Sequence, residues 1–149
     1  METTDIGLGT GLRRLLELLD GDLDAHYARS IPGYRSRYTP IMKALAGGGS
    51  LTIKTIAAAS GVSHSAASQT VSRMAAENLV EWEVGADARQ RMIRLSGKGR
   101  DLLPTLRVQW RRTASAALEL EREIALPLAQ AVARAIAALE AKPFGDRVR

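Results

Sequence analysis

The chain has 149 residues, a net charge of +5, 46% hydrophobic residues, 4% aromatic residues and no cysteine. Its length favours one domain, with or without helical extensions, and the scarcity of aromatic residues favours packed helices over a large sheet. The lack of cysteine excludes disulfides, thiolate zinc sites and thiol-based redox sensing. No apolar run reaches about 18 residues and the first residues do not resemble a signal peptide, so we expect a cytoplasmic protein with no membrane partner.

Positive charge is concentrated in the middle of the chain. Residues 1–25 carry a net charge of −4, whereas residues 26–50 carry +4 and residues 51–100 carry +3. This distribution fits a partner that carries phosphates, such as a nucleic acid. On charge alone, a basic surface that only keeps the protein in solution is an equally good interpretation.

The first part of the chain predicts two helices. Leucines recur at helical spacing between Gly11 and Leu19 and predict an amphipathic helix there. Ile31-Pro32-Gly33 interrupts the pattern, and residues 37–46 form the second predicted helix, with Pro40 in its first turn. The glycines at 47–49 end this helix.

A helix-turn-helix pattern follows. Thr52 can cap a helix that ends near Ser60, and Gly61 can supply the turn. Ser63 is a good N-cap for a second helix over residues 64–77. Two helices joined by so short a turn are typical of proteins that place the second helix in the major groove of DNA.

A hairpin and two more helices complete the chain. Asn78 can end the preceding helix in the left-handed conformation. Residues 80–84 alternate apolar and polar side chains and predict a strand, and residues 92–95 predict its antiparallel partner. Ser96 can cap a long helix that reaches about residue 119, and Pro127 suits the start of the last helix.

This order of elements predicts a mainly α fold with a small β-hairpin wing, that is, a winged helix-turn-helix flanked by helices from both chain ends. We expect an N-terminal dimerisation region over residues 1–35, a DNA-binding domain over 36–98 and C-terminal dimerisation helices over 99–149.

The second helix of the motif has a small, polar outer face that suits a DNA groove. Gln69 can bond bidentately to adenine, Ala66 can contact a thymine methyl group, and Arg73 can contact a phosphate. Taken alone, the same face would also fit a solvated helix of any bundle. The predicted contacts to the major groove and phosphates are Thr52, Ser63, His64, Ser65, Ala66, Ser68, Gln69, Ser72 and Arg73.

The hairpin tip carries arginines that can reach a second groove. Arg89 lies in the predicted turn over residues 85–89 and Arg91 follows it, and arginine favours the negative potential of a narrow minor groove. Asp87 can pair with Arg89 and fix the direction of its guanidinium group. The alternative is an ordinary charged turn.

Two stretches, LTIKTIAAASGVSHSAASQTVSRMAAENLVEW and DARQRMIRLSGKG, together resemble the multiple antibiotic resistance regulator (MarR) family. The resemblance implies a homodimer that binds an inverted repeat in double-stranded DNA. It places the second helix in the major groove and Arg89 in the minor groove, with Asp87 orienting it. His64 stands where proline is common in the family, and Asn78 where glycine is common.

Dimerisation also follows from apolar stripes on the terminal helices, which would leave exposed patches on a monomer. The alternative is that the two stripes pack on each other within one chain. The predicted dimerisation residues are Leu12, Leu15, Leu16, Leu19, Leu128, Val132, Ile136 and Leu139.

The resemblance further implies a repressor that a small aromatic or anionic effector releases from DNA. Aromatic rings beside a cation can hold a phenolic acid, and the candidate pocket residues are His26, Tyr27, Tyr34, Arg37 and Tyr38. The simpler interpretation, which we favour, is that the tyrosines belong to the core and that Arg37 is a surface charge.

The sequence offers no enzymatic signature. It has no glycine-rich phosphate loop, no paired histidines of a metalloprotease and no nucleophile elbow, so we expect no catalytic residue, no cofactor and no metal. The alternatives to a specific regulator are a winged-helix module that binds proteins and a non-specific architectural DNA-binding protein without an effector.

Overall fold

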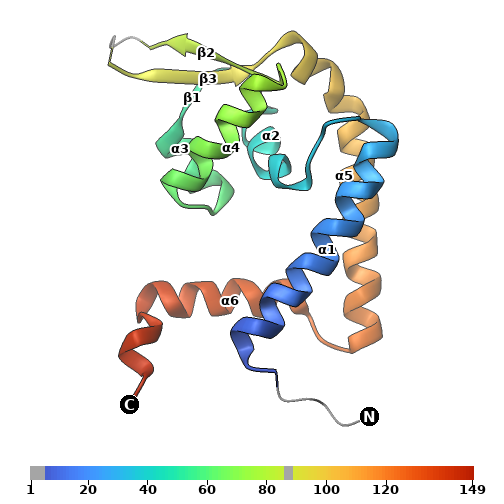
Figure 1. The fold of residues 1–149 in the computed structure, drawn as a ribbon, viewed down its shortest axis with the longest axis vertical. Coiled ribbons are helices and arrows are strands. Elements are labelled where there is room, and N and C mark those ends of the chain that lie inside the picture. Colours follow the sequence, from blue (N-terminus) through green and yellow to red (C-terminus); the bar gives the residue numbers. More distant parts are fainter. Residues whose placement is uncertain (1–5, 86–88) are drawn as a thin grey trace. The chain divides into compact units, whose positions relative to one another are not determined.

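The computed structural model describes residues 6–85 and 89–149. It contains two compact units, and the boundary between them falls between Leu103 and Pro104. The elements, drawn in Figure 1, are α1 (Leu8–Ser30), η1 (Ser36–Tyr38), α2 (Thr39–Leu45), β1 (Leu51–Thr52), α3 (Ile53–Ser60), α4 (His64–Ala76), β2 (Val80–Val84), β3 (Arg91–Leu95), α5 (Gly97–Ile124), α6 (Leu128–Ala141) and η2 (Phe144–Arg147). The predicted fold class, mainly α with a small hairpin, is confirmed.

Helix α1 is longer than the leucine pattern predicts. It begins at Leu8 and continues to Ser30, past Gly21, which lowers helix stability by only about 1 kcal/mol. It ends where Pro32 and Gly33 follow, and Gly33 adopts a positive φ of 86°. The predicted end near Leu19 is therefore wrong, because a polar second half of a helix carries no apolar periodicity to reveal it.

The sheet has three antiparallel strands in the order β1-β3-β2. The register pairs Val80 with Leu95 and Trp82 with Ile93, so these four side chains share one face of the hairpin. The two-residue strand β1 pairs Leu51 with Ile93. Strand β1 could not be predicted from the sequence, since two residues are too few to show alternation.

The core of the first unit is built from the helices of the motif, the hairpin and a group of tyrosines. The buried apolar side chains of this unit are Tyr27, Ile31, Tyr34, Tyr38, Ile41, Met42, Leu45, Ile56, Ala57, Ala67, Val71, Met74, Leu79, Val80, Ile93, Leu95 and Leu103. Every element of the helix-turn-helix and its hairpin thus contributes to one core, which fixes the outward face of α4 relative to the hairpin.

The second unit contains helix α6, which has no buried residue. Its N-terminus is held by a hydrogen bond from the Ala129 amide to the Glu121 carboxylate at 2.8 Å. Near its C-terminus, the Arg147 guanidinium donates to the Ala138 carbonyl at 2.8 Å. Val132, Ile136 and Leu139 are 42–52% exposed, so the helix presents an apolar stripe to solvent.

Within the described ranges, no single helix is long and apolar enough to cross a membrane. Helices α5 and α6 pass that test only together, as a bent pair, and only on length and composition.

Candidate nucleic-acid interface

The turn between α3 and α4 has the geometry that the sequence predicts. The Thr55 amide donates to the Thr52 hydroxyl at 3.1 Å, and the Ala66 amide donates to the Ser63 hydroxyl at 3.1 Å, so both predicted N-caps are confirmed. Gly61, between the two helices, adopts a φ of 68°. A residue with a side chain would be strained there, so glycine sets the angle at which α4 leaves the turn.

Helix α4 buries one face and exposes the other. Ala67, Val71 and Met74 are fully buried, as their helical spacing predicts. Gln69 and Arg73 lie on the opposite, exposed face. The helix contains no acidic residue, so this face offers hydrogen-bonding groups and positive charge without a carboxylate to repel phosphates.

The other predicted contacts differ in their exposure. Thr52 and Ser68 are half-buried, and the exposed ones are Ser63, His64, Ser65, Ala66 and Ser72. The Ser72 hydroxyl donates to the Ser68 carbonyl at 3.0 Å within the helix, which occupies its proton. Toward a binding partner, the Ser72 hydroxyl would therefore act as a hydrogen-bond acceptor. Of the nine predicted contact residues, seven are thus exposed and two are half-buried.

Replacing Ser63 by alanine should destabilise the fold, because the first turn of α4 would lose the acceptor for the Ala66 amide. We expect a loss of about 1 kcal/mol in the free energy of unfolding, measured by urea denaturation. Ser65→Ala is the matched control, since that exposed side chain caps no helix end. Equal effects of the two substitutions would contradict the capping role.

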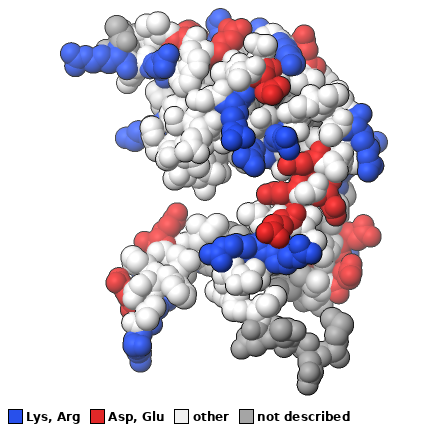
Figure 2. Space-filling view, viewed as in Figure 1, with Lys and Arg blue, Asp and Glu red and all other residues white. Residues whose placement is uncertain are grey.

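The wing presents positive charge at its end. Figure 2 shows basic side chains there, and both Arg89 and Arg91 are exposed. The Arg91 guanidinium lies over the Trp82 ring, 4.7 Å from its centroid, a cation–π contact that restricts its direction. This role of Trp82 was not predicted from the sequence. Asp87, the predicted partner of Arg89, lies outside the described residues.

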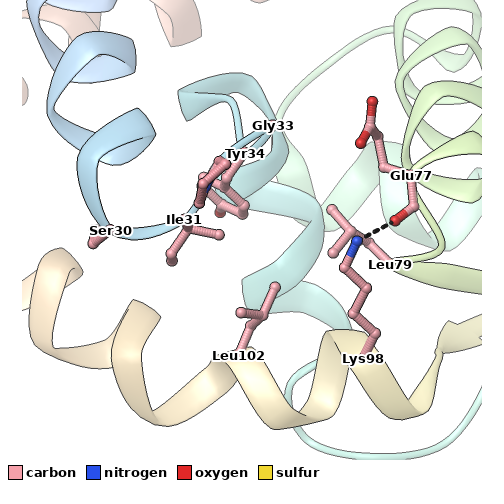
Figure 3. Close-up of a pocket in the computed structure, with 9 residues that line it drawn as sticks. Ser30, Ile31, Gly33, Tyr34, Glu77, Leu79, Lys98 and Leu102 are labelled. Carbon is pink, nitrogen blue, oxygen red and sulfur yellow. Dashed lines mark hydrogen bonds between the residues drawn. The ribbon is translucent and has the colours of Figure 1, made fainter.

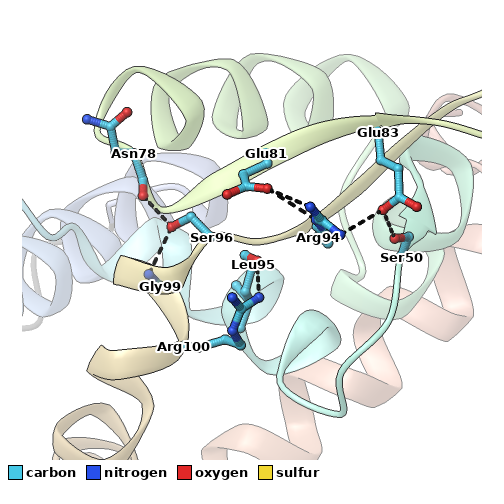
Figure 4. A network of polar contacts seen from close by, with 9 residues as sticks. All are labelled: Ser50, Asn78, Glu81, Glu83, Arg94, Leu95, Ser96, Gly99 and Arg100. Atoms are coloured by element: carbon cyan, nitrogen blue, oxygen red, sulfur yellow. Dashed lines mark hydrogen bonds and ion pairs between the residues drawn. The ribbon is translucent and has the colours of Figure 1, made fainter.

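The other face of the hairpin carries paired charges. The Arg94 guanidinium lies 3.0 Å from the Glu81 carboxylate and 3.6 Å from the Glu83 carboxylate. The Ser50 hydroxyl also donates to Glu83 at 2.7 Å (Figure 4). Arg94 is thus balanced by two acids.

The first turn of α5 forms hydrogen bonds with the C-terminal end of α4. The Ser96 hydroxyl donates to the Asn78 carbonyl and accepts from the Gly99 amide at 3.0 Å (Figure 4). The Lys98 ammonium donates to the Glu77 carbonyl at 3.0 Å. We call these contacts of Ser96, Lys98 and Gly99 with residues 77–79 the α4–α5 clamp. The predicted left-handed Asn78 is confirmed, with a φ of 59°.

The tyrosines of the candidate ligand pocket pack against one another. The Tyr27 and Tyr34 ring centroids are 4.7 Å apart, those of Tyr34 and Tyr38 are 5.7 Å apart, and all three residues are buried. His26 lies 6.4 Å from the Tyr27 ring, and Arg37 is exposed. This arrangement agrees with the simpler interpretation, in which the tyrosines form part of the core.

A separate cavity lies within the first unit, beside the α4–α5 clamp. Its volume is about 170 Å³, and its lining includes Ile31, Tyr34, Glu77, Leu79, Lys98 and Leu102 (Figure 3). Only Tyr34 is common to this cavity and the candidate pocket of the sequence analysis. Nothing local in the sequence marks the cavity, because its walls come from three distant segments.

Comparison with known proteins agrees with this geometry. Residues 36–90 match the family model described as MarR family. The regulator MOSR of M. tuberculosis, solved in complex with DNA, shares 23% identity with a TM-score of 0.76, over 93% of this chain and 100% of that one. The S. aureus MepR–DNA complex shares 15% identity with a TM-score of 0.71, over 91% and 99%.

A third similar structure is NadR in complex with 4-hydroxyphenylacetate. It shares 17% identity with a TM-score of 0.58, over 96% of this chain and 98% of that one. A search of curated proteins finds no match. The matched family consists of transcription regulators, which agrees with the expectation of a protein that is not an enzyme.

Proposed function

Since residues 36–90 match the model of the MarR family, we propose that this protein is a homodimeric, sequence-specific repressor that binds an inverted repeat in double-stranded DNA. The observation that carries the proposal is the acid-free, exposed face of α4 combined with the two arginines of the wing. A helix of this kind fits the major groove, while arginines on a hairpin reach the adjacent minor groove.

Within this proposal, α4 provides the sequence readout. Gln69 bonds to an adenine edge and Ala66 contacts a thymine methyl group. Ser63 and Arg73 contact phosphates and set the register of the helix on the duplex. The Trp82 ring holds the Arg91 guanidinium at 4.7 Å from its centroid, so Arg91 is oriented before DNA arrives.

The proposed dimer is formed by the terminal helices. Leu12, Leu16 and Leu19 of α1 are 46–57% exposed, and the apolar stripe of α6 is 42–52% exposed. Exposed apolar side chains in such number are typical of an interface. A second copy of the chain would cover them and would place a second α4 about one turn of DNA away from the first.

Ile136→Asp should weaken the dimer, because a carboxylate would be buried in the middle of the α6 stripe. We expect the dissociation constant of the dimer to rise about 100-fold or more, since burying an unpaired charge costs several kcal/mol. Sedimentation velocity over a range of protein concentrations measures this dissociation constant. Ala137→Asp is the control, since Ala137 lies outside the apolar stripe of α6. If the Ile136→Asp variant still formed a stable dimer, α6 would be excluded from the interface.

Repression is proposed to end when a small effector binds. NadR in complex with 4-hydroxyphenylacetate has the same fold as this chain, which supports a search for a compound of similar size and charge. Because the three tyrosines are buried against one another, the tyrosine group would have to open before it could admit a ligand.

The salt dependence of binding to duplex DNA tests this function. If about six phosphates are contacted, the affinity should fall about a thousandfold between about 50 and 200 mM salt, because phosphate contacts release counterions. Fluorescence anisotropy with a labelled duplex measures this fall. Absence of binding at the lowest salt would contradict DNA recognition and would favour a protein-binding winged helix.

A further inference from the structure

The two faces of the hairpin formed by β2 and β3 give their arginines different surroundings. Arg94 lies on one face and is paired with Glu81 and Glu83 (Figure 4). Arg91 precedes Arg94 by three residues, so it lies on the opposite face, because side chains alternate along a strand. Among the described residues, no carboxylate pairs with Arg91, and its guanidinium contacts the Trp82 ring instead. The charge of Arg91 is therefore not balanced by a described acid.

The register of the hairpin makes Trp82 a support for Arg91. Val84 pairs directly with Arg91, and Trp82 pairs with Ile93, so Trp82 and Arg91 are diagonal neighbours on one face. An aromatic ring and a long side chain reach each other across such a diagonal. Trp82 is half-buried, whereas Arg91 and the short Val84 beside it are exposed. The ring is thus anchored in the hairpin, while the guanidinium above it stays open to a partner.

Arg91 lies on the face of the hairpin that is directed toward the helices. Ile93 and Leu95 follow it on the same face, and both are buried in the core against which α3 packs (Figure 1). When α4 occupies a major groove and the wing tip the adjacent minor groove, one sugar–phosphate strand separates the two grooves. That strand runs along the helix side of the wing, which is the side that carries Arg91 and not Arg94.

We propose that Trp82 is a positioning residue that holds the Arg91 guanidinium toward the phosphates bordering the minor groove. This role rests on the proposed function, since it concerns the same DNA interface. A free arginine side chain loses rotamer freedom when it binds a phosphate, and a side chain that is already restricted loses less. The planar guanidinium can stack on the ring and still donate hydrogen bonds to phosphate oxygens in its own plane.

Two substitutions separate the positioning residue from the residue that touches DNA. Trp82→Leu removes the ring but keeps the cation, so it should lower the affinity of a dimer for DNA about tenfold without changing the salt dependence. Arg91→Met removes the cation, so it should reduce the slope of log affinity against log salt by about one for each half-site. Trp82→Phe keeps an aromatic face and should recover most of the affinity that Trp82→Leu loses.

The experiment measures the binding of the full-length protein to a labelled duplex of random sequence, by fluorescence anisotropy over a range of salt concentrations. A random sequence suffices, because a phosphate contact carries no sequence information. Trp82→Leu is tested in the wild type and in the Arg91→Met background, where it should have no further effect. Arg134→Met, which removes an exposed arginine of α6, is the matched control and should change neither the affinity nor the slope.

A second readout uses the free protein and needs no DNA. Because the Arg91 guanidinium lies over the Trp82 ring, the ring current should shift the Arg91 Nε–H signal upfield in NMR spectra. Trp82→Leu should remove this shift. An Arg91 signal that is the same with and without the ring would overturn the contact on which the proposal depends.

The outcomes separate this proposal from the proposed function. If the wild type binds DNA tightly but Trp82→Leu has no effect, or has an equal effect with and without Arg91, the positioning role of Trp82 is overturned and the proposed function stands. If the ring-current shift is present but the wild type does not bind the duplex even at low salt, the proposed function is overturned, and the role of this pair in DNA binding with it.

Discussion

Replacing Gln69 by alanine should lower the affinity for a specific operator about 100-fold or more. A bidentate contact between a side chain and a base discriminates by about 1–3 kcal/mol, and a dimer would lose this contact in both half-sites. Gln69 is exposed in the middle of α4, so its removal should leave the fold intact. Competition binding with the selected operator and a scrambled duplex measures the loss.

The effect should be confined to specific binding, because phosphate contacts supply most of the affinity for the scrambled duplex. Gln130→Ala, an exposed glutamine on α6, is the matched control and should change neither affinity. An operator affinity of Gln69→Ala equal to that of the wild type would exclude this side chain from base recognition.

Replacing Gly99 by alanine should strongly destabilise the first unit. A Cβ atom at Gly99 would lie 2.2 Å from the Leu79 carbonyl oxygen, closer than any van der Waals contact allows. The Leu79 carbonyl oxygen is a backbone atom and also accepts a hydrogen bond from the Ser96 amide at 3.0 Å. It therefore cannot move away from the added Cβ atom without moving the backbone. We expect a loss of about 3 kcal/mol, the upper end for overpacked sites, measured by urea denaturation.

Gly97→Ala provides a control in the same helical turn. An added Cβ atom there meets nothing closer than the Arg100 guanidinium at 4.0 Å. Since alanine is the better helix former, this substitution should be neutral or should stabilise the protein by up to about 1 kcal/mol. If both glycine variants unfolded at the same urea concentration, the close approach of α5 to Leu79 would not be a real constraint.

Features governed by neighbouring residues could be predicted from the sequence. The caps at Thr52, Ser63 and Ser96 are confirmed by hydrogen bonds across three residues. The turn at Gly61 and the left-handed conformation of Asn78 are confirmed as well. These predictions succeed because a cap or a turn depends on residue types that lie within one helical turn of each other.

Features governed by distant residues could not be predicted. The pairing of Arg91 with Trp82 depends on the hairpin register, and the close packing of Gly99 on Leu79 depends on how α5 leaves the sheet. A lone glycine in a helix gives no sign of which backbone approaches it. The cavity was missed for the same reason, because its walls meet only in the folded chain.

Selection of bound duplexes from a random DNA pool, with the purified protein at moderate salt, tests the central claim most directly. A dimer with one α4 in each half-site should enrich an inverted repeat whose half-sites lie about 10 base pairs apart. That repeat would be the operator for the Gln69→Ala measurement. Binding without enrichment of any sequence, or enrichment of a single half-site, would contradict a dimeric sequence-specific regulator.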